Sequence, residues 1–237
     1  MPGGALVLWD VDRTLLYVGE TDRRVYREAF ERVVGRPVER LPARGTGVTM
    51  PLAVRQLLRE NGVPEPEVEA LAERVIRLLP ELLAARGVEM REGGRLMGGA
   101  VAALQAVRRT AGLIPTVLTG NLRANAEIKL QAFALSSYLD SSIGGFSSDD
   151  SHRPALVAVA QRRAGLKHRT AFTRANTVII GDSLEDIRTG LQGGARVIGV
   201  ASGTADAQDL EDAGADAVLT DLTDAQVLLA TIALLVD

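Results

Sequence analysis

Two aspartates one residue apart, Asp10 and Asp12, are the residues of this chain whose type and spacing best suit chemistry. They follow the apolar run 5–9, whose length and content predict a buried strand. Because side chains alternate along a strand, both carboxylates would start on the same face. Crowded carboxylates repel each other unless a cation lies between them or one is protonated. The pair therefore predicts a divalent metal together with a nucleophile or an acid–base pair, and so an enzyme.

Other polar residues follow apolar runs or precede a helix further along the chain: Thr119, Gly120, Asn121, Arg153, Asp182 and Asp186. The carboxyl ends of parallel strands lie along one edge of a sheet, so these distant segments would converge on one cleft. Each signal alone has an ordinary structural explanation. Asp182 or Asp186 alone is typical of a helix N-cap, Thr119-Gly120 of a turn, and Arg153 of a surface charge. Their joint order is what favours a site.

The elements that would position these residues alternate along the chain. The pattern predicts strands at 5–10, 114–119, 142–146, 177–181, 196–200 and 217–220, and helices at 100–110, 122–134, 154–163, 184–192, 207–213 and 225–236. Short apolar strands that alternate with helices indicate an α/β fold, a Rossmann-like doubly wound parallel sheet with helices on both faces.

The segment from 16 to 94 has a different texture. Its apolar residues recur at helical spacing, which predicts three or four helices and no strand over 21–91. We therefore expect an α/β core formed by 1–15 and 95–237, with 16–94 inserted as a small α-helical cap. Hinges would lie near 16–20 and 92–99, and the cap would open and close over the cleft.

Composition excludes several classes of protein. The 237 residues are 46% hydrophobic and 24% charged, which is ordinary for a soluble globular protein. A net charge of −3 gives no broad electrostatic reason to bind nucleic acid or an anionic membrane. The chain has no cysteine, no signal-peptide pattern and no apolar run of membrane length, so we expect a cytoplasmic protein. Monomer and homodimer both remain open.

These motifs resemble those of the haloacid dehalogenase-like superfamily of phosphatases and related hydrolases, over nearly the whole chain. The residues that carry the resemblance are, in motif order, Asp10 with Asp12, then Thr119, Arg153, and Asp182 with Asp186. The inserted segment is similar to the cap of one subgroup. The resemblance implies a Mg²⁺-dependent phosphatase that acts on a small phosphorylated metabolite through an aspartyl-phosphate.

The resemblance also implies roles for single residues. Asp10 would be the nucleophile, and Asp12 would protonate the leaving oxygen and then activate water. Asp182, with Asp10 and the backbone carbonyl of Asp12, would hold Mg²⁺, and Asp186 would support that site. Thr119 would receive phosphate oxygens. The expected substrate-binding residues are Arg13, Thr14, Gly120 and Asn121.

Two positions depart from the usual motifs. Arg13 stands where glycine is usual, and Arg153 replaces the usual lysine. Arg153 would neutralise charge on the phosphoryl group, although a planar fork and a compact ammonium place charge differently. Lys129 could take the lysine's role, but an exposed helix lysine is the favoured interpretation. We therefore expect Arg153→Ala to lose most activity and Lys129→Ala to keep it.

Other functions remain open to different degrees. A second acid at Asp12 disfavours dehalogenation, and the absence of lysine from 16–94 disfavours phosphonate cleavage through a Schiff base. The nearest match to the cap signature of sugar phosphomutases, at 43–47, lacks its acid. The alternatives are a sugar phosphomutase and a non-catalytic regulatory or binding module of the same fold.

Overall fold

A parallel sheet lies at the centre of the computed structural model, which describes residues 4–42 and 47–236. Its strands run in the order β5-β4-β1-β6-β7-β8, and every pairing between them is parallel. Their bounds are β1 Ala5–Trp9, β4 Leu113–Thr119, β5 Gly145–Phe146, β6 Thr177–Gly181, β7 Arg196–Val200 and β8 Ala217–Leu219. The predicted fold class, a doubly wound Rossmann-like α/β sheet, is confirmed.

Strand β1 is central, and all five of its residues are buried. Val7 and Trp9 pack into the apolar core on one face of the sheet, while Leu6 and Leu8 pack into the core on the other. A strand covered on both faces has no solvent side, so its sequence is apolar throughout instead of alternating. Asp10 is therefore the first residue of this segment that can reach the edge of the sheet.

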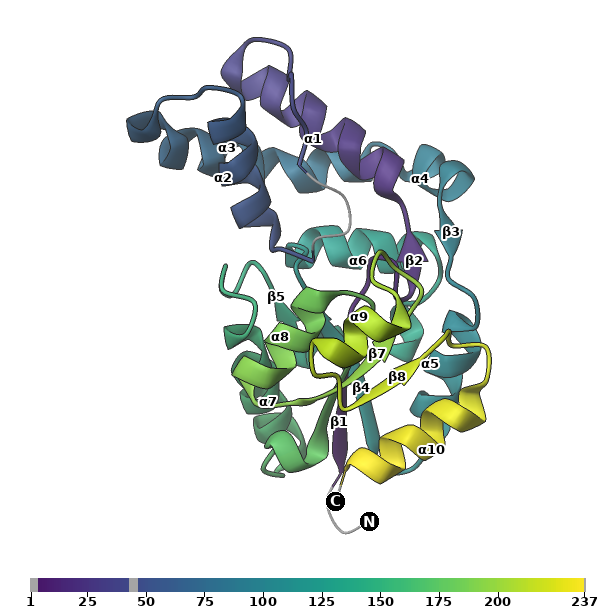
Figure 1. Cartoon of the computed structure of the whole chain (residues 1–237). Helices are drawn as coiled ribbons and strands as arrows, with labels where there is room; N and C mark the ends of the chain where they lie inside the picture. The colour runs from purple at the N-terminus through teal and green to yellow at the C-terminus, as the bar shows by residue number, and fades with distance from the viewer. Residues whose placement is uncertain (1–3, 43–46, 237) are drawn as a thin grey trace.

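Helices cover both faces of the sheet (Figure 1). Helices α5 (Ala100–Arg109), α6 (Arg123–Ala132) and α10 (Ala225–Leu235) contribute to one core. Helices α7 (Ala155–His168), α8 (Leu184–Gly193) and α9 (Ala207–Asp212) contribute to the other.

The described residues between β1 and Arg95 form four helices, which lie beyond the carboxyl ends of the strands (Figure 1). These are α1 Gly19–Val34, α2 Met50–Glu60, α3 Glu65–Ala84 and α4 Gly87–Gly93. The chain enters and leaves them through a two-stranded antiparallel ribbon, β2 (Leu16–Tyr17) and β3 (Arg95–Leu96). Two residues are too few to leave a periodic signal, so the sequence predicted the helices but not the ribbon.

Two predicted elements differ from the structure. The strand expected at 142–146 is reduced to β5, because Ser141–Ile143 form a turn of 3₁₀ helix in which the Asp140 side chain accepts a hydrogen bond from the backbone N–H of Ser142. Helix α7 continues to His168, past its expected end at 163. Residues 43–46, most of the segment compared with the phosphomutase signature, lie outside the described residues. Within the described residues, no helix combines the length and apolar character that crossing a membrane requires.

Candidate active site

Asp10 and Asp12 leave the end of β1 and reach different partners. Asp10 is 7% exposed and accepts a hydrogen bond from Arg153. Asp12 has a side chain 36% exposed and accepts hydrogen bonds from Lys129 and Asn121. The two aspartates therefore have separate buried cations, although one residue separates them in the chain.

The Asp10 carboxylate lies in a buried acidic cluster. Arg153, 3% exposed, donates through Nη2 to Asp10 Oδ1 at 2.8 Å and to Asp186 Oδ1 at 2.5 Å. Its other terminal nitrogen donates to the backbone carbonyl of Gly47 at the start of the segment that leads into α2. Burial, and then repulsion from Asp186, raises the pKa of Asp10 well above its usual range despite Arg153. The surroundings of Asp10 thus favour additional positive charge.

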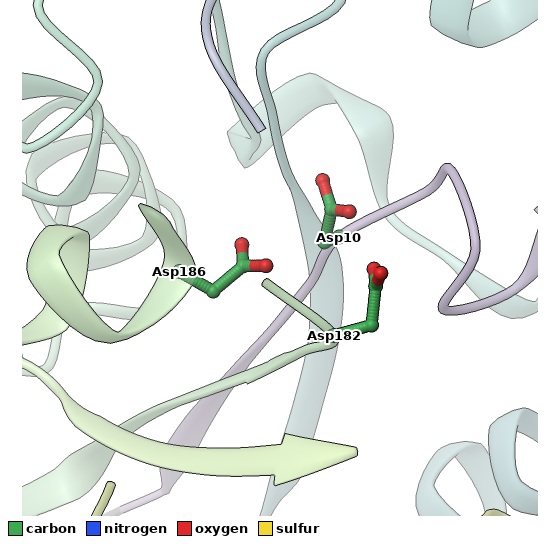
Figure 2. A group of neighbouring side chains, drawn as sticks. All are labelled: Asp10, Asp182 and Asp186. Atoms are coloured by element: carbon green, nitrogen blue, oxygen red, sulfur yellow. The ribbon is translucent and has the colours of Figure 1, made fainter. Parts of the chain in front are cut away.

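Asp182 and Asp186 complete this cluster (Figure 2). Asp182 follows β6 and accepts a hydrogen bond from the Thr14 hydroxyl at 2.9 Å. Asp186 lies in the first turn of α8 and forms a capping box with Ser183, whose backbone and hydroxyl donate to its Oδ2. The N-cap of α8 is thus Ser183 and not Asp186, which is the third residue of the helix and caps it reciprocally while it also contacts Arg153. Burial, and then Asp186, raises the pKa of Asp182 to about 7.

Close approach at this cluster requires glycine. A Cβ at Gly181 would lie 2.3 Å from the carboxyl carbon of Asp186, and one at Gly203 would lie 1.8 Å from Asp182 Oδ2. Any larger residue would displace the carboxylates. The end of β6 at Gly181 and the loop that carries Gly203 therefore press backbone against the acidic cluster and keep it away from solvent.

The donor set fits a hard divalent cation. Oxygens of Asp10, Asp182 and Asp186 all lie within 4.8 Å of one another. Three buried carboxylates face one guanidinium, so the charge is unbalanced, and oxygen-only ligands are what Mg²⁺ prefers. Both oxygens of Asp186 are already bonded, to Arg153 and Ser183. The residues best placed to bind an ion directly are therefore Asp10 and Asp182, with Asp186 holding the arginine.

Lys129 is fully buried, so the expectation of an exposed helix lysine is wrong. Its Nζ donates to both oxygens of Asp12 at 2.9 and 3.0 Å, to Asp22 Oδ2 at 2.7 Å and to Asn121 Oδ1 at 2.9 Å. Burial alone would lower the pKa of Lys129, but Asp12 and then Asp22 outweigh it and hold the pKa above its usual range. Helix α6 directs Lys129 inward, toward α1 and the end of β1. Lys129 and Arg153 occupy different positions: within the described residues, Lys129 is hydrogen-bonded to Asp12, whereas Arg153 is hydrogen-bonded to Asp10.

Asp22 is a site residue that the sequence analysis missed. It lies in the first turn of α1, where an acid reads as an ordinary helix-terminal residue. Burial raises its pKa to about 6, and Lys129 opposes that shift. Only the tertiary structure brings it to Lys129, 107 positions along the chain.

The segment after β4 faces Asp12. The Asn121 side-chain amide donates to Asp12 Oδ2 at 2.7 Å and to the Thr119 hydroxyl at 2.8 Å. The carbonyl of Gly120 accepts from the backbone N–H of Met50, which begins α2. The beginning of α2 therefore touches the segment after β4 through a backbone hydrogen bond at the rim of the site.

A cavity of about 230 Å³ lies between the sheet edge and the inserted helices. Its walls include most of the predicted site residues: Asp10, Asp12, Arg13, Thr119, Gly120, Asn121, Arg153 and Asp182. Thr14 and Asp186 are buried behind this wall and contact Asp182 and Arg153. The prediction that distant segments converge on one cleft is therefore correct for the predicted residues as a group.

Arg13 has a strained backbone, with φ at +67°. This region costs a non-glycine residue about 1–2 kcal/mol, which explains why glycine is usual at this position. Ser202 donates a hydrogen bond to the Arg13 carbonyl at 2.9 Å. The guanidinium stacks on Tyr17, with 4.7 Å between its central carbon and the ring centroid.

Known proteins share this fold. A predicted phosphatase from Clostridium acetobutylicum has a TM-score of 0.70 at 20% identity, over 96% of this chain and 99% of its own. A hydrolase from Pseudomonas syringae has a TM-score of 0.66 at 22% identity, over 97% and 99%. CbbY from Rhodobacter sphaeroides, solved in complex with phosphate, has a TM-score of 0.64 at 21% identity, over 93% and 96%.

No curated protein gives a significant match to the sequence. The model of the haloacid dehalogenase-like hydrolases, in contrast, matches residues 7–190. That range begins in β1 and ends in α8, so it contains both aspartates of the first segment, the inserted helices and the whole acidic cluster. The chain belongs to the haloacid dehalogenase-like hydrolase family.

Proposed function

We propose that this hydrolase is a Mg²⁺-dependent phosphatase that cleaves a small phosphomonoester through an aspartyl-phosphate on Asp10. The observation that carries the proposal is the division of the two aspartates between different surroundings. Asp10 lies against a buried guanidinium and a metal-type carboxylate cluster, whereas Asp12 lies on a lysine and an amide at the cavity wall. Two carboxylates with unlike surroundings suit two different roles.

Asp10 would attack phosphorus with one carboxylate oxygen, so that a P–O bond forms to Asp10 and the bond to the leaving alcohol breaks. Arg153, 2.8 Å from Asp10 Oδ1, orients that carboxylate and offsets its charge. The Thr119 hydroxyl, with the backbone amides of Gly120 and Asn121, would receive the phosphoryl oxygens. Bound Mg²⁺ would supply charge neutralisation at the Asp10–Asp182 oxygens.

Asp12 would give its proton to the leaving oxygen and later take one from the water that hydrolyses the aspartyl-phosphate. Hydrogen bonds from Lys129 and Asn121 hold the Asp12 carboxylate in one orientation. This supports a role for Asp12 as a positioned acid–base residue and not as a freely solvated side chain. The second step releases inorganic phosphate and restores both aspartates.

The inserted segment 16–94 would act as a cap over the cavity. Backbone contacts from Gly47 and Met50 to the site, and the ion pair from Asp22 to Lys129, support closure of this segment over the cavity. The β2–β3 ribbon would be where it pivots. Exclusion of water strengthens electrostatic interactions at the reacting phosphoryl group.

The test is release of inorganic phosphate from p-nitrophenyl phosphate and from a panel of small metabolite phosphates, with Mg²⁺ and with chelator. We expect turnover that needs Mg²⁺ and is lost in Asp10→Asn, while Asp212→Asn, at an exposed position on α9, keeps it. Tight phosphate or Mg²⁺ binding without turnover across the panel would instead support a binding module. Isomerisation of a sugar phosphate without phosphate release would support a phosphomutase.

A further inference from the structure

Two arginines line the cavity without a carboxylate partner. Arg13 and Arg23 both form part of its wall, with Asp10, Thr119 and Arg153. Neither guanidinium lies within ion-pair distance of a carboxylate in the part of the chain that the structure describes. The Arg23 side chain donates to a neutral group, the carbonyl of Pro42, at 3.2 Å. Both cations are therefore available to a ligand.

The two buried cations of the site, Arg153 and Lys129, already have carboxylate partners. Arg153 lies on Asp10 and Asp186, and Lys129 is shared by Asp12 and Asp22. The transferred phosphoryl group would be received by Thr119 and Arg153, beside the nucleophile. Arg13 and Arg23 thus supply positive charge in addition to the residues that would receive the transferred phosphoryl group.

Arg13 is also held in place before any ligand arrives. Its stack on Tyr17 and the hydrogen bond from Ser202 fix the side chain and the backbone. Its φ of +67° is one that glycine would adopt without strain. Strain of this kind persists where the surrounding structure enforces it, and it is concentrated at functional sites. A fixed guanidinium loses less freedom when it binds a carboxylate or phosphate through two parallel hydrogen bonds.

We propose that the substrate carries a second anionic group, a carboxylate or a second phosphate, and that Arg13 and Arg23 bind it in the same cavity. This inference rests on the proposed phosphatase activity and specifies its substrate class. The cavity of about 230 Å³ restricts the substrate to a small molecule.

A matched substrate pair tests this directly. Glycerol 3-phosphate and 3-phosphoglycerate differ by a hydroxymethyl group in place of a carboxylate. We expect kcat/KM for 3-phosphoglycerate to exceed that for glycerol 3-phosphate by at least about tenfold, because a charge-assisted pair is gained. In Arg13→Gly and in Arg23→Ala this ratio should fall toward one. Glycine suits the backbone at position 13, so this variant is expected to fold.

Arg95 provides a matched control, because it also stacks on Tyr17 at 4.7 Å but is exposed and forms no part of the cavity wall. Arg95→Ala should keep the wild-type ratio. A wild-type ratio of one or less would overturn the inference. So would an equal loss for both substrates in Arg13→Gly and Arg23→Ala, because these residues would then serve the transferred phosphoryl group.

Binding separates this inference from the proposed reaction. In Asp10→Asn, calorimetry should give 3-phosphoglycerate at least about tenfold tighter binding than glycerol 3-phosphate, whether or not the wild type turns either over. Selective binding without wild-type hydrolysis would reject the phosphatase and keep the anion site. Hydrolysis of both substrates with equal binding would reject the second anion site and keep the phosphatase. A third ligand, 2,3-bisphosphoglycerate, distinguishes a preference for phosphate from one for carboxylate.

Discussion

Asp10 and Asp12 belong to one short segment, yet the structure surrounds them differently. Asp10 shares a buried cluster with Asp182 and Asp186, where three carboxylates face Arg153. Asp12 reaches the cavity wall, where Lys129 is bonded to it and to Asp22. The first group sets three carboxylates against one guanidinium, and the second sets two carboxylates against one ammonium. The Asp10 group therefore has the larger excess of negative charge and is where the proposed metal ion would bind, and this asymmetry suits one aspartate to attack phosphorus and the other to move protons.

The largest expected effect is on the Asp10 side. Asp10→Asn keeps the shape of the side chain and removes the nucleophilic oxygen anion. We expect kcat to fall by at least about 10⁴-fold, since removal of a nucleophile abolishes the covalent route. Phosphate release and capture of a phosphoenzyme by acid quenching would measure it. A stable phosphoenzyme in this variant would place the nucleophile elsewhere and contradict the division of roles between Asp10 and Asp12.

Arg153→Ala should cause the second-largest loss of activity. Loss of its guanidinium leaves Asp10 and Asp186 repelling each other in a buried cluster, and we expect kcat to fall by about 10²–10³-fold. Arg153→Lys is the informative partner, because a lysine restores charge without the fork. Activity kept in Arg153→Ala would mean that this cation serves the fold and not the reaction.

Lys129→Met should impair proton transfer by Asp12 more than attack by Asp10. Methionine keeps much of the volume but leaves Asp12 and Asp22 unpaired, which should lower the free energy of unfolding by about 3–5 kcal/mol. The single-turnover rate for an alkyl phosphate should fall by about 10²-fold, because its alkoxide leaves only with a proton from a well-placed Asp12. The burst of p-nitrophenol should fall much less, since that phenolate leaves without a proton.

Asp22→Asn is the control for this prediction, because it preserves a side-chain oxygen for Lys129. Its effect on the alkyl substrate should be smaller than that of Lys129→Met. An equal loss for alkyl and aryl substrates in Lys129→Met would contradict a role through Asp12. The burial of Lys129 also replaces the expectation that Lys129→Ala keeps its activity, since that variant would leave two buried partners unpaired.

The smallest expected effect is the response of stability to pH and Mg²⁺. The folded-state pKa of Asp182, about 7, lies above its ordinary value of 3.8. The folded protein therefore binds more protons than the unfolded chain between these values, so the metal-free protein should lose stability as pH rises from about 4 to about 7. Mg²⁺ displaces that proton and should raise the Tm more at about pH 8 than at about pH 5.5. Thermal melts of the wild type and Asp182→Asn measure this, and a Mg²⁺ effect that persists unchanged in Asp182→Asn would place the ion elsewhere.

The sequence by itself determined the order along the chain of the strands and helices, apart from the β2–β3 ribbon, and the segments that meet at the sheet edge. Buried parallel strands are short apolar runs, and polar residues directly after them must lie at their carboxyl ends. Asp10, Thr119 and Asp182 were found in this way. Arg153 was found because it precedes α7 in a position that matches the third motif.

Only the tertiary structure decided which cation each aspartate binds. Lys129 and Asp22 lie on amphipathic helices, where a charged residue usually faces solvent, and no local pattern distinguishes the exception. Their pairing depends on how the inserted helices pack over α6, through α3 and α4, which are far from it in the chain. Asp10 and Asp12 reach the same edge of the sheet because both follow β1, but they differ in character because long-range packing places a guanidinium beside one and an ammonium beside the other.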